Sequence, residues 1–300
     1  MTILELIEAS AQQLTESGVA FGHGTSNAFD EAAWLVLWQL GLPLDSPLEG
    51  TENDPELVTN RAVTPVEQAQ VAALLIARIE SRKPAAYLTH EAWLQGVAFY
   101  VDERTIVPRS LVAELLVNGG IDYWLTEATL RVLDLCTGNG SLAVIAAMAY
   151  PDVRVDAADI SEDALAVARI NVHKHGLQQR IALLTSDGLA DVKGPYDLIL
   201  CNPPYVNARS MAALPPEYQA EPALALDGNR LGGSDGMDFI RGLLRDAPQH
   251  MSEHAVLVLE IGNERDHFEA AFPGLEVLWL ETSAGDYQVL LATREVLLQI

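Results

Sequence analysis

The stretch RVLDLCTGNGSLA (131–143) decides the fold that we predict for this 300-residue chain. Residues 131–136 form an apolar run typical of a buried strand, and residues 141–150 follow as a predicted helix. Between them, Gly138 and Gly140 allow the backbone to approach a ligand closely above the N-terminus of that helix. Taken alone, this pattern fits either a nucleotide-type binding turn or a purely structural one.

Strands and helices alternate on the C-terminal side of this turn. Six further strands are predicted at 153–159, 181–186, 196–201, 255–262, 275–281 and 287–293, with a helix at 162–175. Because helical segments separate most of these strands, we expect a mostly parallel sheet that is covered on both faces. Only residues 282–286 join the last two strands, which is too short for a parallel crossover, so this pair should be antiparallel. The predicted fold class is α/β, with a seven-stranded sheet that binds ligands beyond the carboxyl ends of its strands.

The N-terminal part of the chain has a different pattern. Thr2 with Glu5 and Thr64 with Glu67 form two capping boxes, each before an amphipathic helical segment. Residues 91–107 carry the β-branched and aromatic side chains of a short strand pair. The chain is therefore predicted to consist of a small helical domain (1–88), a strand-pair linker (89–108) and the α/β domain (109–300).

The formal net charge of −24 limits the classes of partner. It disfavours unaided binding to DNA or RNA, where affinity depends on Lys and Arg at phosphates, and it favours a basic macromolecular partner or simply aids solubility. Two cysteines imply no disulfide framework and fit a reducing cytoplasm. The N-terminus has no signal-peptide pattern, and no apolar run approaches the roughly 18 residues of a membrane span, so we expect no membrane association.

Three aspartates near predicted strand ends point to the ligand. Asp159 follows Gly140 by 19 residues, the place and spacing of an acid that accepts hydrogen bonds from a ribose diol. Asp134 lies inside the first strand, where an acid is costly to bury unless backbone N–H groups or a ligand ammonium meet it. Asp187 is placed either to accept from an adenine amine or to serve as a turn acid before Gly188. The turn and Asp159 fit a nicotinamide dehydrogenase or an S-adenosylmethionine enzyme, and Asp134 favours the latter.

The end of another predicted strand, YDLILCNPPYV (196–206), indicates the chemistry. Two prolines stop the strand and fix the direction of the Pro203 carbonyl. A planar amide nitrogen is a poor nucleophile, so an enzyme that methylates it must hold its N–H bonds with acceptors such as the Asn202 side-chain carbonyl and the Pro203 carbonyl. Tyr205 offers a flat face to a planar group. We therefore predict catalysis by positioning and electrostatics.

At this point the chain resembles the class I, Rossmann-like S-adenosylmethionine-dependent methyltransferases with an NPPY motif, and more closely the protein glutamine N5-methyltransferases. The resemblance covers nearly the whole chain and rests on the helical N-terminal domain, the strand pair, and the motifs IVPRS (106–110), DLCTGNG (134–140), VDAADIS (155–161), NPPYV (202–206) and YQAEPALAL (218–226). It implies that residues 1–88 recognise the substrate and that 109–300 form the methyltransferase domain.

The combined site prediction has three parts and includes no metal. The cofactor, S-adenosylmethionine, which leaves as S-adenosylhomocysteine, is assigned to Asp134, Cys136, Thr137, Gly138, Asn139, Gly140, Asp159, Asp187 and Asn202. The substrate glutamine is assigned to Arg109, Asn202, Pro203, Pro204 and Tyr205. The residues expected to act in catalysis are Asn202, Pro203 and Tyr205.

Two branches of the family differ in substrate. The release-factor enzymes carry a PRP-x-TE pattern where this chain has PRSLVAE (108–114). That difference, together with FGHGTSN (21–27), resembles the branch that methylates the large-subunit ribosomal protein L three, and implies a basic protein substrate before ribosome assembly. Two departures stand out: Cys136 replaces the first turn glycine, and Gly188 replaces an aromatic residue that often follows the Ser-Asp pair, which leaves the packing of adenine on that side open.

Three alternative functions differ from this assignment. A release-factor glutamine methyltransferase has the same chemistry on another protein. An adenine-N6 DNA methyltransferase also uses an NPPY-type tip, but normally needs a basic groove, which a charge of −24 argues against. A non-catalytic ribosome-assembly protein that keeps the fold is disfavoured by the intact Asn202 and Asp159. Residues 207–235 form a long Pro/Gly-rich segment that we interpret as a substrate-covering loop.

Overall fold

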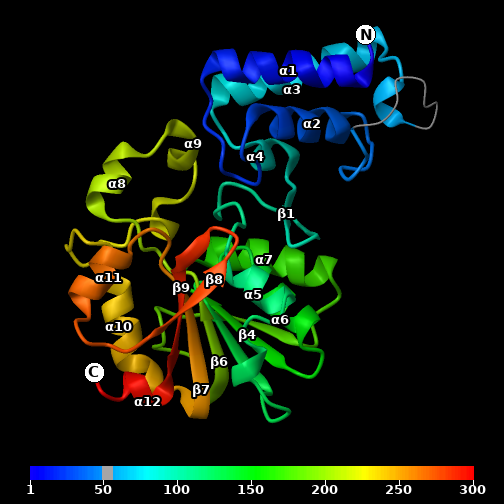
Figure 1. The fold of residues 1–300 in the computed structure, drawn as a ribbon. Helices are drawn as coiled ribbons and strands as arrows, with labels where there is room; N and C mark the ends of the chain where they lie inside the picture. Colours follow the sequence, from blue (N-terminus) through cyan, green and yellow to red (C-terminus); the bar gives the residue numbers. More distant parts are fainter. Residues whose placement is uncertain (49–56) are drawn as a thin grey trace. The chain divides into compact units, whose positions relative to one another are not determined.

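The computed structural model describes residues 1–48 and 57–300. Its contacts divide the chain into two compact units, which we call the helical unit and the α/β unit (Figure 1). The helical unit consists of Met1–Glu91 and Pro215–Ala220, and the α/β unit consists of Ala92–Leu214 and Glu221–Ile300. The predicted strand-pair linker thus lies largely in the α/β unit, and six residues from the middle of the predicted methyltransferase domain group with the helical unit.

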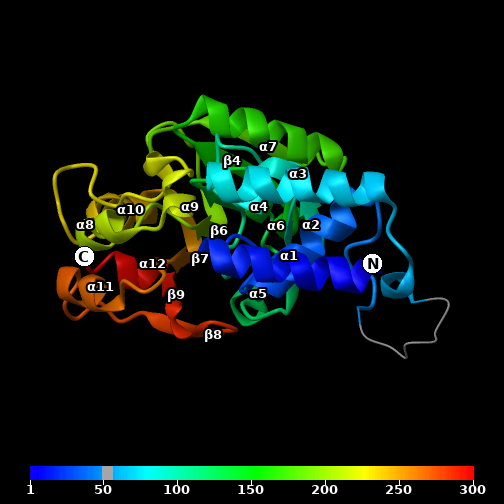
Figure 2. The same cartoon turned by 90° about the horizontal axis from the view of Figure 1, so that it is seen from above.

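The helical unit is a small bundle. Its helices are α1 (Ile3–Ser17), α2 (Ala28–Gln39), α3 (Pro65–Ser81), α4 (Ala85–Thr89) and the short α9 (Pro216–Gln219), with one 3₁₀ turn, η1 (Val58–Asn60). Both predicted capping boxes are present, at the starts of α1 and α3, which lie side by side in Figure 2. Buried aliphatic residues such as Ile7, Leu35 and Val71 form one core between α1, α2 and α3. No helix in the described residues of either unit combines the length and apolar character needed to span a membrane.

The α/β unit contains the predicted seven-stranded sheet. Its strands are β3 (Arg131–Leu135), β4 (Arg154–Asp159), β5 (Ile181–Thr185), β6 (Tyr196–Cys201), β7 (Met251–Glu260), β8 (Leu278–Thr282) and β9 (Gly285–Thr293). They lie in the order β5-β4-β3-β6-β7-β9-β8, and β9 runs antiparallel to both of its neighbours. The predicted antiparallel pair is therefore confirmed, and the fold is the class I, Rossmann-like α/β fold. β7 begins at Met251 rather than at Ala255, because its first residues are largely polar and exposed and lie outside the apolar run.

Two hydrophobic cores cover the two faces of the sheet. Alternate strand residues contribute to opposite cores, so that Leu198 and Leu200 belong to one and Ile199 and Cys201 to the other. The first core includes side chains of α5 (Val112–Val117), α6 (Ser141–Ala149) and α7 (Glu162–Lys174). The second includes side chains of α10 (Asp238–Asp246), α11 (Arg265–Ala271) and α12 (Arg294–Leu297). With both faces covered, the polar groups at the carboxyl ends of the strands form the accessible part of the sheet.

A buried asparagine ties the short strand pair to the glycine turn. The pair is an antiparallel hairpin of β1 (Ala92–Leu94) and β2 (Val97–Phe99). Asn171 on α7 accepts from the Tyr100 backbone N–H at 2.7 Å and donates to the carbonyls of Tyr100 and Asn139 at 2.9 and 2.8 Å. The chain that leaves the hairpin is thereby fixed against the turn between β3 and α6.

Replacing Asn171 with alanine should lower the stability of the α/β unit by about 2–4 kcal/mol, since unsatisfied buried polar groups cost about 1–3 kcal/mol each. The change leaves one backbone donor and two carbonyls without their partner. The measurement is the urea midpoint of unfolding followed by circular dichroism. Lys174→Ala, at an exposed position of the same helix, is the control and should change stability by no more than about 0.5 kcal/mol. Equal midpoints for both variants would refute the proposed tie.

Candidate functional site

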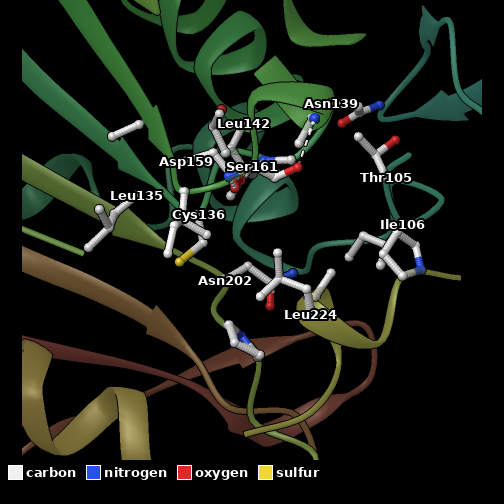
Figure 3. A pocket seen from close by; sticks show the side chains of 18 of the residues that line it. Thr105, Ile106, Leu135, Cys136, Asn139, Leu142, Asp159, Ser161, Asn202 and Leu224 are labelled. Carbon is white, nitrogen blue, oxygen red and sulfur yellow. Dashed lines mark hydrogen bonds between the residues drawn. The ribbon is translucent and has the colours of Figure 1, made fainter. Parts of the chain in front are cut away.

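A cleft lies at the carboxyl ends of β3, β4, β5 and β6, and all of its lining residues belong to the α/β unit (Figure 3). It holds about 950 Å³ of space, which includes open solvent. The site residues predicted from the sequence that line it are Arg109, Cys136, Thr137, Gly138, Asn139, Asp159, Asp187, Asn202 and Pro204. The other four, Asp134, Gly140, Pro203 and Tyr205, are not among the lining residues and lie next to them in the chain.

The turn after β3 is held in an unusual backbone conformation. Cys136, Gly138 and Gly140 all have positive φ angles, of 61°, 56° and 81°. A Cβ at Gly140 would lie 3.1 Å from the Cβ of Ala168 on α7, so glycine is needed there for close packing of the turn against that helix. No atom lies within 4 Å of a Cβ built at Gly138, so glycine is needed there for the backbone angle alone.

Asp134 is fully buried behind the cleft lining. Its Oδ2 accepts from the Thr137 hydroxyl and from the Ala143 backbone N–H, which ties the strand to the turn and to the first turn of α6. Its Oδ1 has no hydrogen-bond partner among the described residues. Burial raises the pKa of this carboxyl to about 7, although both hydrogen bonds favour its charged form.

Asp159 ends β4 and faces the cleft. Its Oδ2 accepts from the Gly138 N–H and its Oδ1 from the Ser161 N–H, both at 2.9 Å, so the acid orders the turn as well as lining the site. Burial raises its pKa, and the charge of Arg230, another lining residue, opposes that rise. The predicted role at a ribose needs lone pairs beyond these two bonds, and a carboxylate has about four acceptor positions.

The side of the cleft at Asp187 contains an aromatic residue that the sequence analysis missed. Asp187 is exposed and lines the cleft, as do Ser186 and Gly188. The ring of Phe239, from α10, lines the same cleft and lies 3.6 Å from a Cβ built at Gly188. The sequence offers no signal for this pairing, because Phe239 belongs to an amphipathic helix far along the chain, where an aromatic residue is usually a core residue.

Two residues of the CNPPYV tip line the cleft, Asn202 (Figure 3) and the buried Pro204, whereas Pro203 is buried and does not line it. Tyr205 donates its hydroxyl to Glu260 Oε1 at 3.5 Å, and its ring lies 2.7 Å from a Cβ built at Gly262. Burial raises the pKa of the Tyr205 phenol, so it stays protonated. These contacts fix the tip to the end of β7, and the predicted contact of Tyr205 with a substrate stays a prediction.

Two buried glutamates hold the IVPRS segment beside the tip. Glu221 accepts from Arg109 Nη1 and Nη2 at 2.6 and 2.7 Å and from the Val107 N–H at 2.9 Å. Glu260 accepts from the Ser110 hydroxyl at 2.6 Å and from the Leu111 N–H at 2.9 Å. Arg109 thus lines the cleft with its guanidinium already paired to a carboxylate. Sequence analysis missed both glutamates, because each lies more than a hundred residues from its partners.

The two cysteines lie together beside the cleft. Leu135 and Cys201 are partners in the parallel pairing of β3 with β6, so Cys136 directly follows the pair. Cys136 lines the cleft, and Cys201 is buried next to it. Burial, followed by the contact with Cys136, raises the pKa of the Cys201 thiol. The thiols are therefore close to one another and, at Cys136, to any ligand of the cleft.

Comparison with known proteins connects this geometry to a family. A family model described as a methyltransferase small domain matches residues 118–217. The ribosomal protein uL3 glutamine methyltransferase of Bordetella pertussis is 50% identical over 299 residues, which cover 99% of this chain and 96% of that protein. The protein of the same description from Burkholderia pseudomallei is 48% identical, over 97% of this chain and 94% of its own length.

Among solved structures, the hMettl16 catalytic domain in complex with MAT2A 3'UTR hairpin 6 has a TM-score of 0.51. The match covers 76% of this chain and 81% of that one at 13% sequence identity. At that identity the likeness shows the shared fold alone.

The raised pKa of Asp134 predicts how stability depends on pH. The folded protein keeps this proton from the ordinary pKa of 3.8 up to about 7, whereas the unfolded chain loses it near 3.8. The contribution of this group to stability is therefore complete below about pH 4 and is lost as the pH rises to about 7, at about 1.4 kcal/mol per pH unit between the two pKa values.

Asp134→Asn should remove this part of the slope, because an amide does not titrate. Asp159 and Glu260, whose pKa values are also raised, should keep their own contributions of the same sign. The measurement is the free energy of unfolding of both proteins at intervals between pH 4 and pH 8. Parallel curves for the wild type and the variant would show that Asp134 does not hold a proton in the folded state.

Proposed function

The chain belongs to the ribosomal protein uL3 glutamine methyltransferase family, and we propose that it methylates the side-chain nitrogen of a glutamine in uL3 with S-adenosylmethionine as the donor. The observation that carries this proposal is the position of Asn202. Its amide enters the cleft formed by the glycine turn and Asp159, so an acceptor for a substrate amide lies beside a candidate cofactor site (Figure 3). The relatives support the substrate, since both are described as acting on uL3.

The residues of the cleft fit S-adenosylmethionine. Asp159 offers acceptors for a ribose diol, and the exposed Asp187 offers one for an adenine amine. Two buried polar atoms at the turn, Asp134 Oδ1 and Asn139 Nδ2, have no hydrogen-bond partner among the described residues, which is the state expected of groups that complete their bonding with a ligand or water. When bound, the cofactor supplies an electrophilic methyl group on a sulfonium.

The adenine assignment also explains the missing aromatic after Asp187. The ring of Phe239 lies where the side chain of a residue larger than glycine at position 188 would point. We therefore assign one face of the adenine site to Phe239. In this proposal the aromatic surface comes from α10 instead of from the turn after β5.

The chain's own groups position the substrate. The side-chain carbonyl of Asn202 and the backbone carbonyl of Pro203 accept the two N–H bonds of the glutamine amide and hold its nitrogen in one orientation. No strong base is needed in this site, because the nitrogen can lose its proton to water after it has gained the methyl group. Glu260 and Gly262 support this tip through Tyr205.

The net charge of −24 supports a substrate that is basic and not yet covered by RNA. Exposed charges of opposite sign accelerate encounter, so methylation of free uL3 should have an apparent KM that rises with salt, as the Debye length falls from about 10 Å at 0.1 M to about 3 Å at 1 M. Intact large subunits, which present phosphate, should be much poorer substrates. Equal rates on both substrates, or a KM independent of salt, would contradict this part of the proposal.

Asn202→Ala should abolish most transfer and leave cofactor affinity within a few-fold of the wild type. The change removes one preorganised polar contact, which is typically worth about 10²–10³ in rate. The measurement is transfer of radiolabelled methyl from S-adenosylmethionine to uL3, with release factor and DNA as parallel acceptors. Preferential labelling of release factor or DNA by the wild type would refute the substrate assignment, and near-normal rates in the variant would refute the role of Asn202.

Phe239→Ala should weaken the binding of S-adenosylhomocysteine roughly tenfold or more, because aromatic stacking on a base is worth about 1–3 kcal/mol. Phe239→Tyr should bind normally. Calorimetry measures the dissociation constants directly and needs no protein substrate. Phe272→Ala is the matched control, since this ring packs on Phe268 at 4.9 Å between centroids and does not line the cleft. An unchanged dissociation constant for Phe239→Ala would exclude the assignment.

A further inference from the structure

Residues 226–238, which we call the bracket, hold the chain that leaves the NPPY motif (202–205). The N–H of Val206 donates to the Leu226 carbonyl at 2.9 Å, and its carbonyl accepts from the Gly228 N–H at 3.1 Å. Val206 is therefore paired with the bracket as in a short parallel ladder. The motif and the bracket both belong to the α/β unit, so this pairing lies inside one unit.

Two glycines let the bracket lie directly on this backbone. A Cβ built at Gly236 would overlap the carbonyl oxygen of Tyr205 and would lie 3.1 Å from the backbone nitrogen of Asn207. A Cβ built at Gly228 would overlap the carbonyl oxygen of Gly236. No side chain fits at either position unless the backbone moves, so the backbones of the bracket and of the residues around Val206 are in direct contact.

The side chain of Asn229 joins the two ends of the bracket to Val206. Its Nδ2 donates to the Val206 carbonyl at 3.0 Å and to Asp227 Oδ1 at 2.7 Å, and its Oδ1 accepts from the Gly236 N–H at 2.8 Å. Both the donor and the acceptor ends of the amide are thus used. An alanine at this position would remove all three bonds without adding an atom.

The bracket is itself attached to a packed helix. Near its end, Asp238 Oδ2 accepts from the Leu231 N–H at 2.8 Å and from the Gly233 N–H at 3.0 Å, which closes the loop. The chain then continues as α10, where Ile240 and Leu244 are fully buried in the second core. Whatever the bracket holds is therefore held against the core of the α/β unit.

The NPPY motif is consequently fixed at both ends. Before it, Cys201 pairs in parallel register with Leu259 of β7, and after it, Val206 pairs with the bracket. Two of the four residues between these points are prolines, whose φ angles are fixed by their rings. Few torsions remain free, so the place at which the bracket holds Val206 sets the direction in which Asn202 points.

Two glutamates support the same stretch through side chains. The Tyr205 hydroxyl donates to Glu260 Oε1 at 3.5 Å, and Asn207 Nδ2 donates to Glu264 Oε1 at 2.7 Å. A side chain can absorb a small shift of the backbone by rotating about its own bonds. Backbone pairing has no such freedom, so the bracket is the stricter of the two supports.

We propose that Asn229 and Gly236 are positioning residues for methyl transfer, because the bracket fixes the backbone after the NPPY motif and thereby aims Asn202. This inference rests on the proposed function, in which Asn202 accepts the substrate amide. The contacts of the bracket do not depend on which protein is methylated. Part of the Pro/Gly-rich segment (207–235) then supports the site, beside the covering role predicted from the sequence.

The first test compares two glycines of the bracket in the full-length chain. Gly236→Ala should lower kcat on uL3 about 10- to 100-fold, because its Cβ displaces the Tyr205 carbonyl and a shift of about 1 Å can cost 10² in rate. Gly232→Ala is the matched control and should keep the wild-type kcat. Both glycines have positive φ angles, of 78° and 93°, but no atom lies within 4 Å of a Cβ built at Gly232.

The second test removes the amide of Asn229. Asn229→Ala should lower kcat about tenfold or more, since the Val206 carbonyl is then less firmly placed. Its control is Asn118→Ala, because Asn118 also accepts from a glycine N–H, that of Gly120 at 2.9 Å, but does not line the cleft. In all variants KM for uL3 and the dissociation constant of S-adenosylhomocysteine should change much less than kcat, because α10 keeps Phe239 in place.

Hydrogen exchange, followed by mass spectrometry well below each Tm, gives a readout that needs no substrate. The paired Val206 N–H should exchange slowly in the wild type. Gly236→Ala and Asn229→Ala should accelerate exchange in peptides that span residues 203–208, whereas the two control variants should not. If Gly236→Ala does not fold, Asn229→Ala and its control decide the outcome.

Three results would overturn the inference. These are a wild-type kcat in both Gly236→Ala and Asn229→Ala, equal losses of kcat and of cofactor affinity, or unchanged exchange at residues 203–208. Failure of the wild type to methylate uL3 would instead refute the proposed function. The same comparison of kcat would then use release factor or DNA if either is labelled, and otherwise unchanged exchange would overturn the bracket and faster exchange would support it.

Discussion

The bond between the Asp134 carboxylate and the Ala143 N–H is the constraint on which the site depends. Together with the Thr137 hydroxyl, it fixes the end of β3 to the start of α6 and forces the turn between them into its left-handed conformations. Only with the turn in this form does the Gly138 N–H meet Asp159 at the end of β4. Two acids from adjacent strands thus shape the floor of the cleft, and the burial of Asp134, which raises its pKa to about 7, is the cost of that rigidity.

Much of the fold follows from local patterns. The capping boxes, the turn after β3 and the antiparallel pair at the C-terminal end depend on neighbouring residues, and the structure confirms all of them. The boundary of β7 was wrong because an exposed strand start is polar and leaves no apolar signal. The residues that line the cleft at the ends of β3, β4 and β6 were also predicted, since the ends of parallel strands meet at one edge of the sheet.

The supports of the site could not be predicted in the same way. Arg109 and Glu221 are 112 residues apart, and Ser110 and Glu260 are 150 apart, so no local pattern relates them. Phe239 on α10 lies close to Gly188, which follows β5, and only the tertiary structure brings these two residues together. From the sequence alone, Gly188 replaces an aromatic residue that the family often has at this position. In the structure the ring of Phe239, which comes from another element, lies close to Gly188 and lines the same cleft.

The buried acids of this protein fall into two groups with different physical roles. Glu217 and Glu221 meet arginines, and such charge pairs select one arrangement of the chain because any other leaves a buried charge uncompensated. Asp134 and Glu260 meet only neutral donors among their hydrogen-bond partners, and burial raises the pKa of both. In the second group, Asp134 Oδ1 has no hydrogen-bond partner among the described residues, and neither does Asn139 Nδ2 in the turn after β3. Atoms without a hydrogen-bond partner also occur at the ion-paired Glu217, so the lack of a partner does not by itself mark a ligand site. The two atoms at the turn differ in their place: Asn139 lines the cleft, and Asp134 directly precedes the lining residue Leu135.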